Sequence, residues 1–312
     1  MNFPEDKKFA FTIIDDTDNS TIENIKPVYD LLTKLGFRTS KSVWVYESRD
    51  QFGGSTLQDE DYANYVIGLQ KKGFEIFLHS ISGGDFKRQE IFDGFEKFNS
   101  VFGNYPRLYA NHSLSKNNIY FEPRYRFVSP IGDILNYIQN IIRSGRKKGF
   151  WGQDPKSEYF WGDLCKEKVE YLRNLTFNNL NLLKVDPQIP YRIKKMQKYA
   201  NYSFSASDGH TVEEFVDITK KENVDLLVKE RGATIIYTHF ASGFMNNGKL
   251  NEDFIKNMEY IAAQGGWFVP VSELLDYLKT KKENHIAFYP YLFKLNVRWI
   301  IGRVLKYIKY SR

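Results

Sequence analysis

The hydrophobic pattern of this 312-residue chain alternates between short apolar runs and longer amphipathic stretches. Short apolar runs bounded by turn residues are typical of strands, and strands that alternate with helical patterns are typical of βα units. The apolar runs predict strands over residues 8–14, 41–46, 74–80, 105–112, 201–207, 231–239 and 267–270. The pattern therefore predicts an α/β fold built on parallel strands.

Amphipathic stretches separate these runs and predict helices, since their apolar residues recur every three or four positions. The predicted helices cover residues 19–36, 57–73, 86–103, 129–145, 251–266 and 271–282. Ser20 or Thr21 suits the N-cap of the first helix, and Gly36 suits its end. Residues 150–165 form an aromatic stretch that predicts a loop. We expect a barrel domain over residues 1–282 and a separate basic aromatic segment over residues 283–312.

Polar side chains stand at the ends of five predicted strands. They are Asp15 and Asp16, His79, Asn111 and His112, Asp208, and His239. The carboxyl ends of strands in parallel barrels and sheets carry the active site. The sequence therefore predicts that these side chains meet at one end of the fold.

The adjacent carboxylates Asp15 and Asp16 predict two different roles, because neighbouring side chains on a strand point to opposite sides. One could bind a metal ion while the other faces a water molecule. Imidazole and carboxylate ligands suit Zn, Fe, Co or Mn rather than Mg or Ca. A metal ion with an open coordination position polarises a carbonyl group and lowers the pKa of its water toward about 7. The alternative is a plain strand-ending turn, and we expect Asp18 to be a loop or helix-cap residue.

These motifs resemble the polysaccharide deacetylases, the NodB-homology family of carbohydrate esterases (family 4 type). The family motif Thr-Phe-Asp-Asp-Gly corresponds to residues 13–17, and its Leu-x-His motif corresponds to residues 237–239. Its motif His-Ser/Thr-x-x-His corresponds to residues 79–83. The resemblance covers roughly residues 8–280 and is closest to a divergent WbmS-like branch associated with bacterial surface polysaccharide. It implies a distorted (β/α)7 barrel, which agrees with the alternation of strands and helices.

The resemblance also implies roles for individual residues. Asp15 would be the general base, Asp16 and His79 would bind the metal, and His239 would be the general acid that protonates the departing amine. Zinc is the expected metal, with Co, Ni, Fe or Mn as alternatives. The expected substrate contacts are Tyr109, Asn111, Asp208 and Trp267, the last beside the acetyl methyl group.

One position departs from the family pattern. The second histidine of the metal motif falls at Gly83, which has no side chain to offer. Either the site is inactive or another residue completes it. His112 is the predicted replacement ligand, with Asp85 as a weaker alternative from the same loop as Gly83.

Composition and charge limit the other interpretations. A single cysteine, Cys165, excludes an intramolecular disulfide and a multi-cysteine zinc site. The first residues lack a long apolar stretch, and no uninterrupted apolar run reaches the length of a membrane span, so we expect a cytoplasmic protein. The net charge is +6, and residues 285–312 carry six basic residues and no acidic one. That segment is either a helix packed on the barrel or a peripheral contact to a membrane or a protein partner. No nucleic-acid-binding motif accompanies the charge.

The sequence therefore predicts a metal-dependent hydrolase that removes N-acetyl groups from an amino sugar in surface-polysaccharide biosynthesis. Two alternatives use the same barrel: an inactive carbohydrate-binding protein, which Gly83 favours, and an O-deacetylase. A third alternative is a basic scaffold that assembles other enzymes at a membrane.

Overall fold

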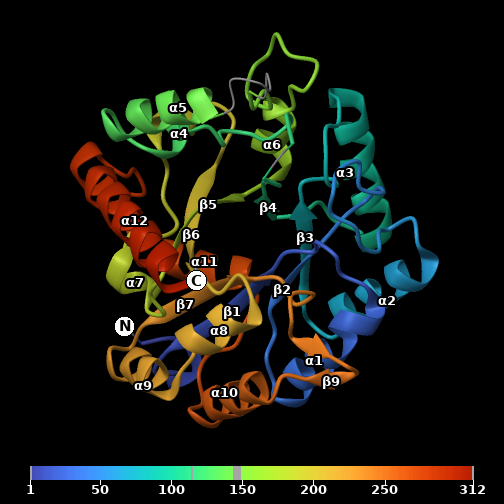
Figure 1. Ribbon diagram of the computed structural model, residues 1–312, viewed down its shortest axis with the longest axis vertical. Helices are drawn as coiled ribbons and strands as arrows, with labels where there is room; N and C mark the ends of the chain where they lie inside the picture. Colours follow the sequence, from blue (N-terminus) through green and yellow to red (C-terminus); the bar gives the residue numbers. More distant parts are fainter. Residues whose placement is uncertain (1, 114, 143–148, 311–312) are drawn as a thin grey trace.

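Seven parallel strands form a closed barrel in the computed structural model, which describes residues 2–113, 115–142 and 149–310 (Figure 1). The strands lie in chain order around the barrel, and the last pairs with the first along its whole length. Their bounds are β1 Ala10–Asp15, β2 Ser40–Val43, β3 Glu75–His79, β4 Leu108–Ala110, β5 Tyr171–Phe177, β6 Tyr202–Asp208 and β7 Ala233–Thr238. The predicted (β/α)7 barrel is confirmed.

Helices connect the strands and cover the outside of the barrel (Figure 1). The longer ones are α1 Ile22–Lys34, α2 Glu60–Lys71, α3 Arg88–Phe102, α5 Ile131–Ile142, α9 Lys221–Lys229, α10 Glu252–Ala263, α11 Val271–Thr280 and α12 Tyr289–Tyr310. Shorter elements are η1 Pro4–Asp6, α4 Pro123–Arg126, α6 Gly162–Lys168, α7 Leu182–Val185, η2 Lys194–Met196, α8 Val212–Ile218, β8 Met245–Asn246 and β9 Lys249–Leu250. The start of α1 follows the predicted signal, since Thr21 accepts a hydrogen bond from the Asn24 N–H.

The seventh strand of the barrel differs from the predicted one. Residues 267–270 were expected to form it, but Trp267 makes only an isolated bridge to Ala10 at the start of β1. The missing strand is β5, where Arg173 and Asn174 interrupt the apolar pattern. The pairing of β5 with β6 shifts register between residues 173 and 176. Such irregularities are common beside active sites, where they change the direction of side chains. Here Arg173 and Asn174 both line a pocket at the carboxyl ends of the strands.

The C-terminal segment packs on the barrel as a long helix, α12 (Figure 1). The Asn296 side chain accepts a hydrogen bond from the Val128 N–H at 2.8 Å, and Arg298 donates one to the Val185 carbonyl at 2.6 Å. The helix also brings Trp299, Arg303 and Lys306 to the pocket at the carboxyl ends of the strands. Residues 283–312 therefore contribute directly to that pocket.

A buried ion pair between the barrel and the surrounding helices holds the end of β1. Asp15 and Lys41, from β1 and β2, are both fully buried, with Oδ2 and Nζ 3.2 Å apart. Tyr29 donates a hydrogen bond to the same oxygen, and the Phe240 N–H donates one to the other oxygen. Burial raises the pKa of Asp15 even though Lys41 favours its charged form. Both carboxylate oxygens are thus occupied within the fold.

We predict that Lys41→Met lowers the free energy of unfolding by about 3–5 kcal/mol at neutral pH, because the Asp15 carboxylate remains buried without its cation. Part of this loss returns on acidification. Burial raises the pKa of Asp15 in the folded state above its value in the unfolded chain. The folded variant therefore binds the proton more tightly than the unfolded chain, and its free energy of unfolding increases as the pH falls. Urea denaturation at neutral and mildly acidic pH measures both effects.

Lys26→Met is the matched control, since Lys26 pairs with Asp30 on the surface with side chains 54% and 50% exposed. This variant should lose no more than about 1 kcal/mol. Equal losses in the two variants would contradict a structural role for the buried pair.

Candidate metal centre and pocket

The carboxyl end of β1 presents carboxylates to both sides of the strand. Asp15 points to Lys41, whereas Asp16 and Asp18 line a pocket on the other side. Alternate residues on an extended chain share a face, which explains why Asp16 and Asp18 lie together. The Asp16 N–H continues the pairing of β1 with β7 by donating to the Thr238 carbonyl at 2.9 Å.

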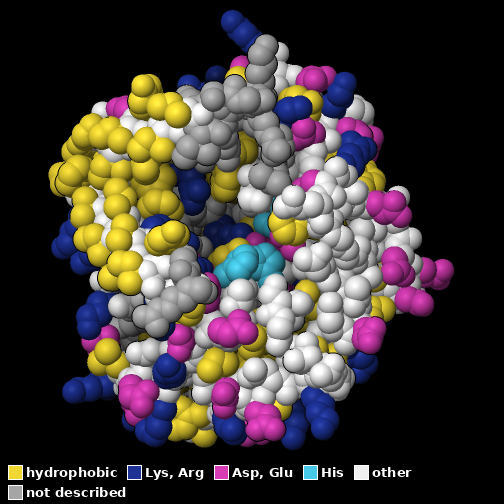
Figure 2. Space-filling view, viewed as in Figure 1, with side chains coloured by type: hydrophobic (Ala, Val, Ile, Leu, Met, Phe, Trp, Pro, Cys, Tyr) yellow, Lys and Arg dark blue, Asp and Glu magenta, His cyan; other side chains and the backbone are white. Residues whose placement is uncertain are grey.

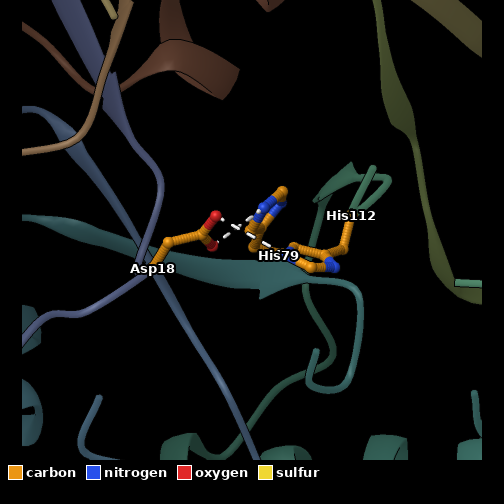
Figure 3. Close-up of side chains that lie close together, drawn as sticks. All are labelled: Asp18, His79 and His112. Atoms are coloured by element: carbon orange, nitrogen blue, oxygen red, sulfur yellow. Dashed lines mark ion pairs between the residues drawn. The ribbon is translucent and has the colours of Figure 1, made fainter. Parts of the chain in front are cut away.

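Asp18 faces two buried imidazoles (Figure 3). Its Oδ1 is 3.2 Å from Nε2 of His79, the last residue of β3, and its Oδ2 is 3.5 Å from Nε2 of His112, which follows β4. One ligand atom from each of the three residues lies within 4.8 Å of the others. Burial alone would raise the pKa of Asp18, but the neighbouring imidazoles of His79 and His112 outweigh burial and hold the pKa well below its ordinary value.

This group fits a divalent metal ion. Both ring nitrogens of His112 and Oδ1 of Asp18 are buried and make no hydrogen bond to any described residue. Two imidazoles and one carboxylate are a donor set typical of Zn, Fe, Co and Mn sites. The group therefore has unused donor atoms of the right chemistry at a spacing that one ion can bridge.

Asp50 occupies the space that a side chain at position 83 would need. A Cβ built on Gly83 would come within 2.5 Å of the Ser48 hydroxyl and 2.8 Å of the Asp50 carboxylate. The other oxygen of Asp50 lies 3.3 Å from Nδ1 of His112. A carboxylate beside the far nitrogen of a ligand histidine orients the ring and raises its basicity. The absence of a histidine at position 83 is thus accompanied by a carboxylate that supports His112.

Arg173 fixes the position of Asp16. The guanidinium donates to both carboxylate oxygens, at 2.8 Å from Nη1 to Oδ1 and by a second bond from Nη2 to Oδ2. Burial would raise the pKa of Asp16, but Arg173, and then His79, lower it below its ordinary value. Nε2 of His79 lies 3.5 Å from Asp16, so this charged carboxylate adjoins the Asp18 group.

His239, the first residue after β7, also lies beside Asp18. Its Nε2 is 3.6 Å from Oδ2 of Asp18, and its ring contacts the ring of His210 at 4.4 Å between centroids. His210 in turn makes a hydrogen bond of 2.9 Å with the Tyr237 hydroxyl. Burial, aided by the charge of His239, lowers the pKa of His210 to about 4, so His210 is neutral at pH 7.

These side chains surround a cavity of about 430 Å³, visible as a hollow with histidine at its centre (Figure 2). Its walls combine residues of the β-strand ends with residues of α12. They include Asp16, Asp18, His79, Asn111, His112, Arg126, Arg173, Asp208, His239, Trp299, Arg303 and Lys306. A cavity of this size can enclose a sugar unit and its substituents.

The predicted site residues are only partly brought together. Asn111 and Asp208 line the cavity, although the Asn111 amide is bonded to the Ile119 backbone. Tyr109 is buried and does not line the cavity: its ring packs at a tilt against Trp161, and its hydroxyl bonds to Ser80. Trp267 lies at the opposite end of β1, packed on Phe3 and Tyr277.

Three residues of the site were not predicted, or were given another role. Asp18 was expected to be a loop residue, yet it lies at the centre of the group. Arg173 and Asp50 were not considered at all. The spacing of Asp16 and Asp18 was an available signal for a shared face, whereas nothing local in the sequence connects Asp50 to His112.

Comparisons with known proteins support the fold. No family model matches the sequence, and no curated protein matches it either. Among solved structures, a protein described as a polysaccharide deacetylase from Mycobacterium smegmatis is similar over 93% of this chain and 97% of its own, with a TM-score of 0.50 and 10% identity. PuuE allantoinase is similar over 89% of this chain and 93% of its own, with a TM-score of 0.52 and 10% identity.

A peptidoglycan deacetylase, PdaC from Bacillus subtilis, is also similar, at 17% identity and a TM-score of 0.42, over 90% of this chain and 95% of its own. At these identities the likeness concerns the fold alone, and the WbmS-like branch stays a prediction. The chain therefore has the NodB-type barrel fold found among polysaccharide deacetylases, as the strand-end motifs predicted.

Proposed function

We propose that this protein is a metal-dependent hydrolase that removes an N-acetyl group from an amino sugar. The observation that supports this proposal is the convergence in one cavity of Asp18, His79 and His112 with an Arg173-bound Asp16 and with His239. Hydrolysis of an acetamide needs an electrophilic site for the carbonyl, a base for water and an acid for the leaving nitrogen. The cavity holds a candidate for each.

Asp18, His79 and His112 would hold the metal ion, and their donor set makes zinc our first proposal, with Co, Ni, Fe or Mn as alternatives. When bound, such an ion supplies Lewis-acid polarisation of the acetyl carbonyl and lowers the pKa of water. Gly83 favoured the inactive alternative, but Asp50 and His112 offer another way to complete the donor set.

We assign the role of general base to Asp16 rather than to Asp15. Asp15 is occupied by Lys41, Tyr29 and the Phe240 N–H, and it does not reach the cavity. Asp16 lines the cavity and is kept charged by Arg173, so it is ready to accept a proton from the attacking water. The guanidinium also fixes the direction in which the carboxylate points.

His239 would donate a proton to the amine nitrogen as the carbon–nitrogen bond breaks. His239 approaches Oδ2 of Asp18 and His79 approaches Oδ1, and His239 lines the same cavity as Asp16, so both groups are available to a substrate there. Asp208 and Asn111 are proposed to border the sugar. A role in surface-polysaccharide biosynthesis, and a cytoplasmic location, remain predictions from the sequence.

We predict that the metal-free protein takes up about one Zn²⁺ or Co²⁺ per chain and that His112→Ala reduces this uptake to the background level. Removal of one of three ligands leaves two donors, which hold an ion weakly. Metal content after dialysis, and the visible spectrum of the Co²⁺ form, measure the change.

The control is His285→Ala, because His285 lies against Tyr202 and outside the cavity. It should bind metal like the unmodified protein. Full uptake by His112→Ala would contradict the proposed ligand set.

We predict that Asp16→Asn lowers the rate of acetate release from N-acetylated saccharides by about 10²–10⁴-fold while metal uptake is kept. The amide keeps the shape of the carboxylate but cannot accept the proton. Acetate release from N-acetyl and O-acetyl substrates is measured together with metal content.

Asp163→Asn is the matched control, since Asp163 forms a similar two-bond pair with Arg88 on the surface, with both bonds at 2.7 Å. Its activity should be unchanged. The proposal fails if the metal-loaded protein releases acetate from no N-acetylated saccharide.

A further inference from the structure

One wall of the cavity is strongly basic. It is formed by β5, the short helix α4 and α12, and its cations are Arg126, Arg173, Arg303 and Lys306. Arg173 is neutralised by Asp16, and Asp208 is shared by Arg303 and Lys306, with its Oδ2 at 2.8 and 3.2 Å from them. Lys306 also pairs with Glu214 at 2.6 Å. Among the described residues, no carboxylate lies within ion-pair distance of Arg126.

Arg126 is held firmly even though no acid faces it. Its Nε donates to the Asn174 side-chain oxygen at 3.3 Å, and another N–H donates to the Asn174 carbonyl. The guanidinium also lies 4.8 Å from the centre of the Phe121 ring. Burial, together with the charges of Arg303 and Arg173, lowers the pKa of Arg126 to about 10, so the guanidinium is still charged at pH 7.

A second donor on this wall also lacks an acceptor. The indole Nε1 of Trp299 is buried and makes no hydrogen bond to any part of the chain that the structure describes. The same indole ring lies 5.3 Å from the guanidinium carbon of Arg303. Arg126 and Trp299 therefore border the cavity as a cation without a carboxylate partner and an N–H donor without an acceptor among the described residues.

We infer that this wall binds a phosphate group of the substrate, which on the proposed function makes the substrate a phosphorylated N-acetyl amino sugar. Guanidinium groups bind phosphate through paired hydrogen bonds, and such charge-assisted bonds are strong in a partly buried site. The dianionic phosphate offers several acceptor oxygens to Arg126, Arg303 and Trp299. A nucleotide diphosphate and a lipid diphosphate both present this chemistry.

Binding measurements test this inference without relying on turnover. Calorimetry on the full chain compares N-acetylglucosamine, N-acetylglucosamine 1-phosphate, UDP-N-acetylglucosamine and a short polyprenyl diphosphate N-acetylglucosamine. The phosphorylated ligands should bind at least about 10-fold more tightly than the free sugar, and Arg126→Gln should remove this advantage with a loss of about 10–100-fold. Tighter binding of either the nucleotide ligand or the lipid ligand supports the inference and identifies the source of the phosphate.

Arg124→Gln is the matched control, because Arg124 lies on the same helix but is half exposed and paired with Glu122. It should leave all affinities unchanged. Trp299→Phe provides a second variant, which keeps an aromatic side chain but removes the N–H donor together with one ring of the indole. Equal affinity for free and phosphorylated sugar, or a phosphate preference that survives Arg126→Gln, would overturn the inference. Absence of acetate release with this preference intact would instead count only against the proposed function.

A separate feature of the surface lies beside the cavity. The outer sides of α5 and α12 carry large apolar side chains that are each 44–68% exposed: Ile134, Tyr137, Ile138, Ile141, Ile301, Val304, Leu305 and Ile308. They form a continuous apolar area at the upper left of Figure 2, over the two helices. We call this area the α5–α12 face.

Basic residues accompany the α5–α12 face. Lys294 is exposed on α12, a helix without acidic residues. The other basic residues of α12 contact the barrel: Arg298 bonds to the Val185 carbonyl, and Arg303, Lys306 and Lys309 pair with Asp208 or Asp217. α12 therefore brings the exposed Lys294 and no acidic residue to this part of the surface, which suits an anionic lipid surface.

We propose, independently of the phosphate site, that the α5–α12 face rests on an anionic lipid surface. Helices with one apolar side and accompanying Lys and Arg residues bind in the plane of the headgroups. Among the described residues, no helix is both long and apolar enough to cross a bilayer. The α5–α12 face would place the cavity, which α12 borders, close to the lipid headgroups.

Vesicle co-sedimentation tests this proposal with phosphatidylcholine alone and with added phosphatidylglycerol. Binding should need the anionic lipid, and Leu305→Asp should weaken it by at least about 10-fold. Leu226→Asp is the matched control, since Leu226 on α9 is 45% exposed away from this face. Equal binding to both vesicles, no binding to either, or a dimer in solution that Leu305→Asp dissociates would overturn the proposal.

Discussion

The structure depends on the neutralisation of three carboxylates that lie within four residues at the end of β1. Asp15, Asp16 and Asp18 are all buried, and charges so close together are unfavourable in a medium of low polarity. Each is compensated by a different part of the barrel: Lys41 from β2, Arg173 from β5, and imidazoles at the end of β3 and after β4 and β7. The barrel must therefore close for these acids to be tolerated.

In this short stretch of chain, one carboxylate contributes to stability and the other two are available for chemistry. Asp15 faces the interior, where its oxygens are fully used, and it contributes to holding β1 to β2. Asp16 and Asp18 face the cavity, where one is oriented by a guanidinium and the other lies among imidazoles. A stable ion pair and a set of groups available to a substrate can thus occupy neighbouring positions.

The sequence could predict the barrel because most of its strands are continuous apolar runs with a polar residue at the carboxyl end. It could also predict that His79, His112 and His239 converge, since each directly ends or follows a strand. β5 was not predicted because Arg173 and Asn174, whose side chains line the cavity, interrupt its apolar pattern. Trp267 was placed in the pocket from its position in the chain, but the three-dimensional path puts it at the other end of β1.

The close contact between Gly83 and Asp50 links two positions that are far apart in the sequence. Any side chain at position 83 would collide with the Ser48 hydroxyl and with the Asp50 carboxylate, which are hydrogen-bonded to each other. A related protein that carries a histidine at the equivalent of position 83 would need space at the equivalents of positions 48 and 50. Covariation of position 83 with these two positions among homologues would then mark which of two histidine arrangements each of them uses.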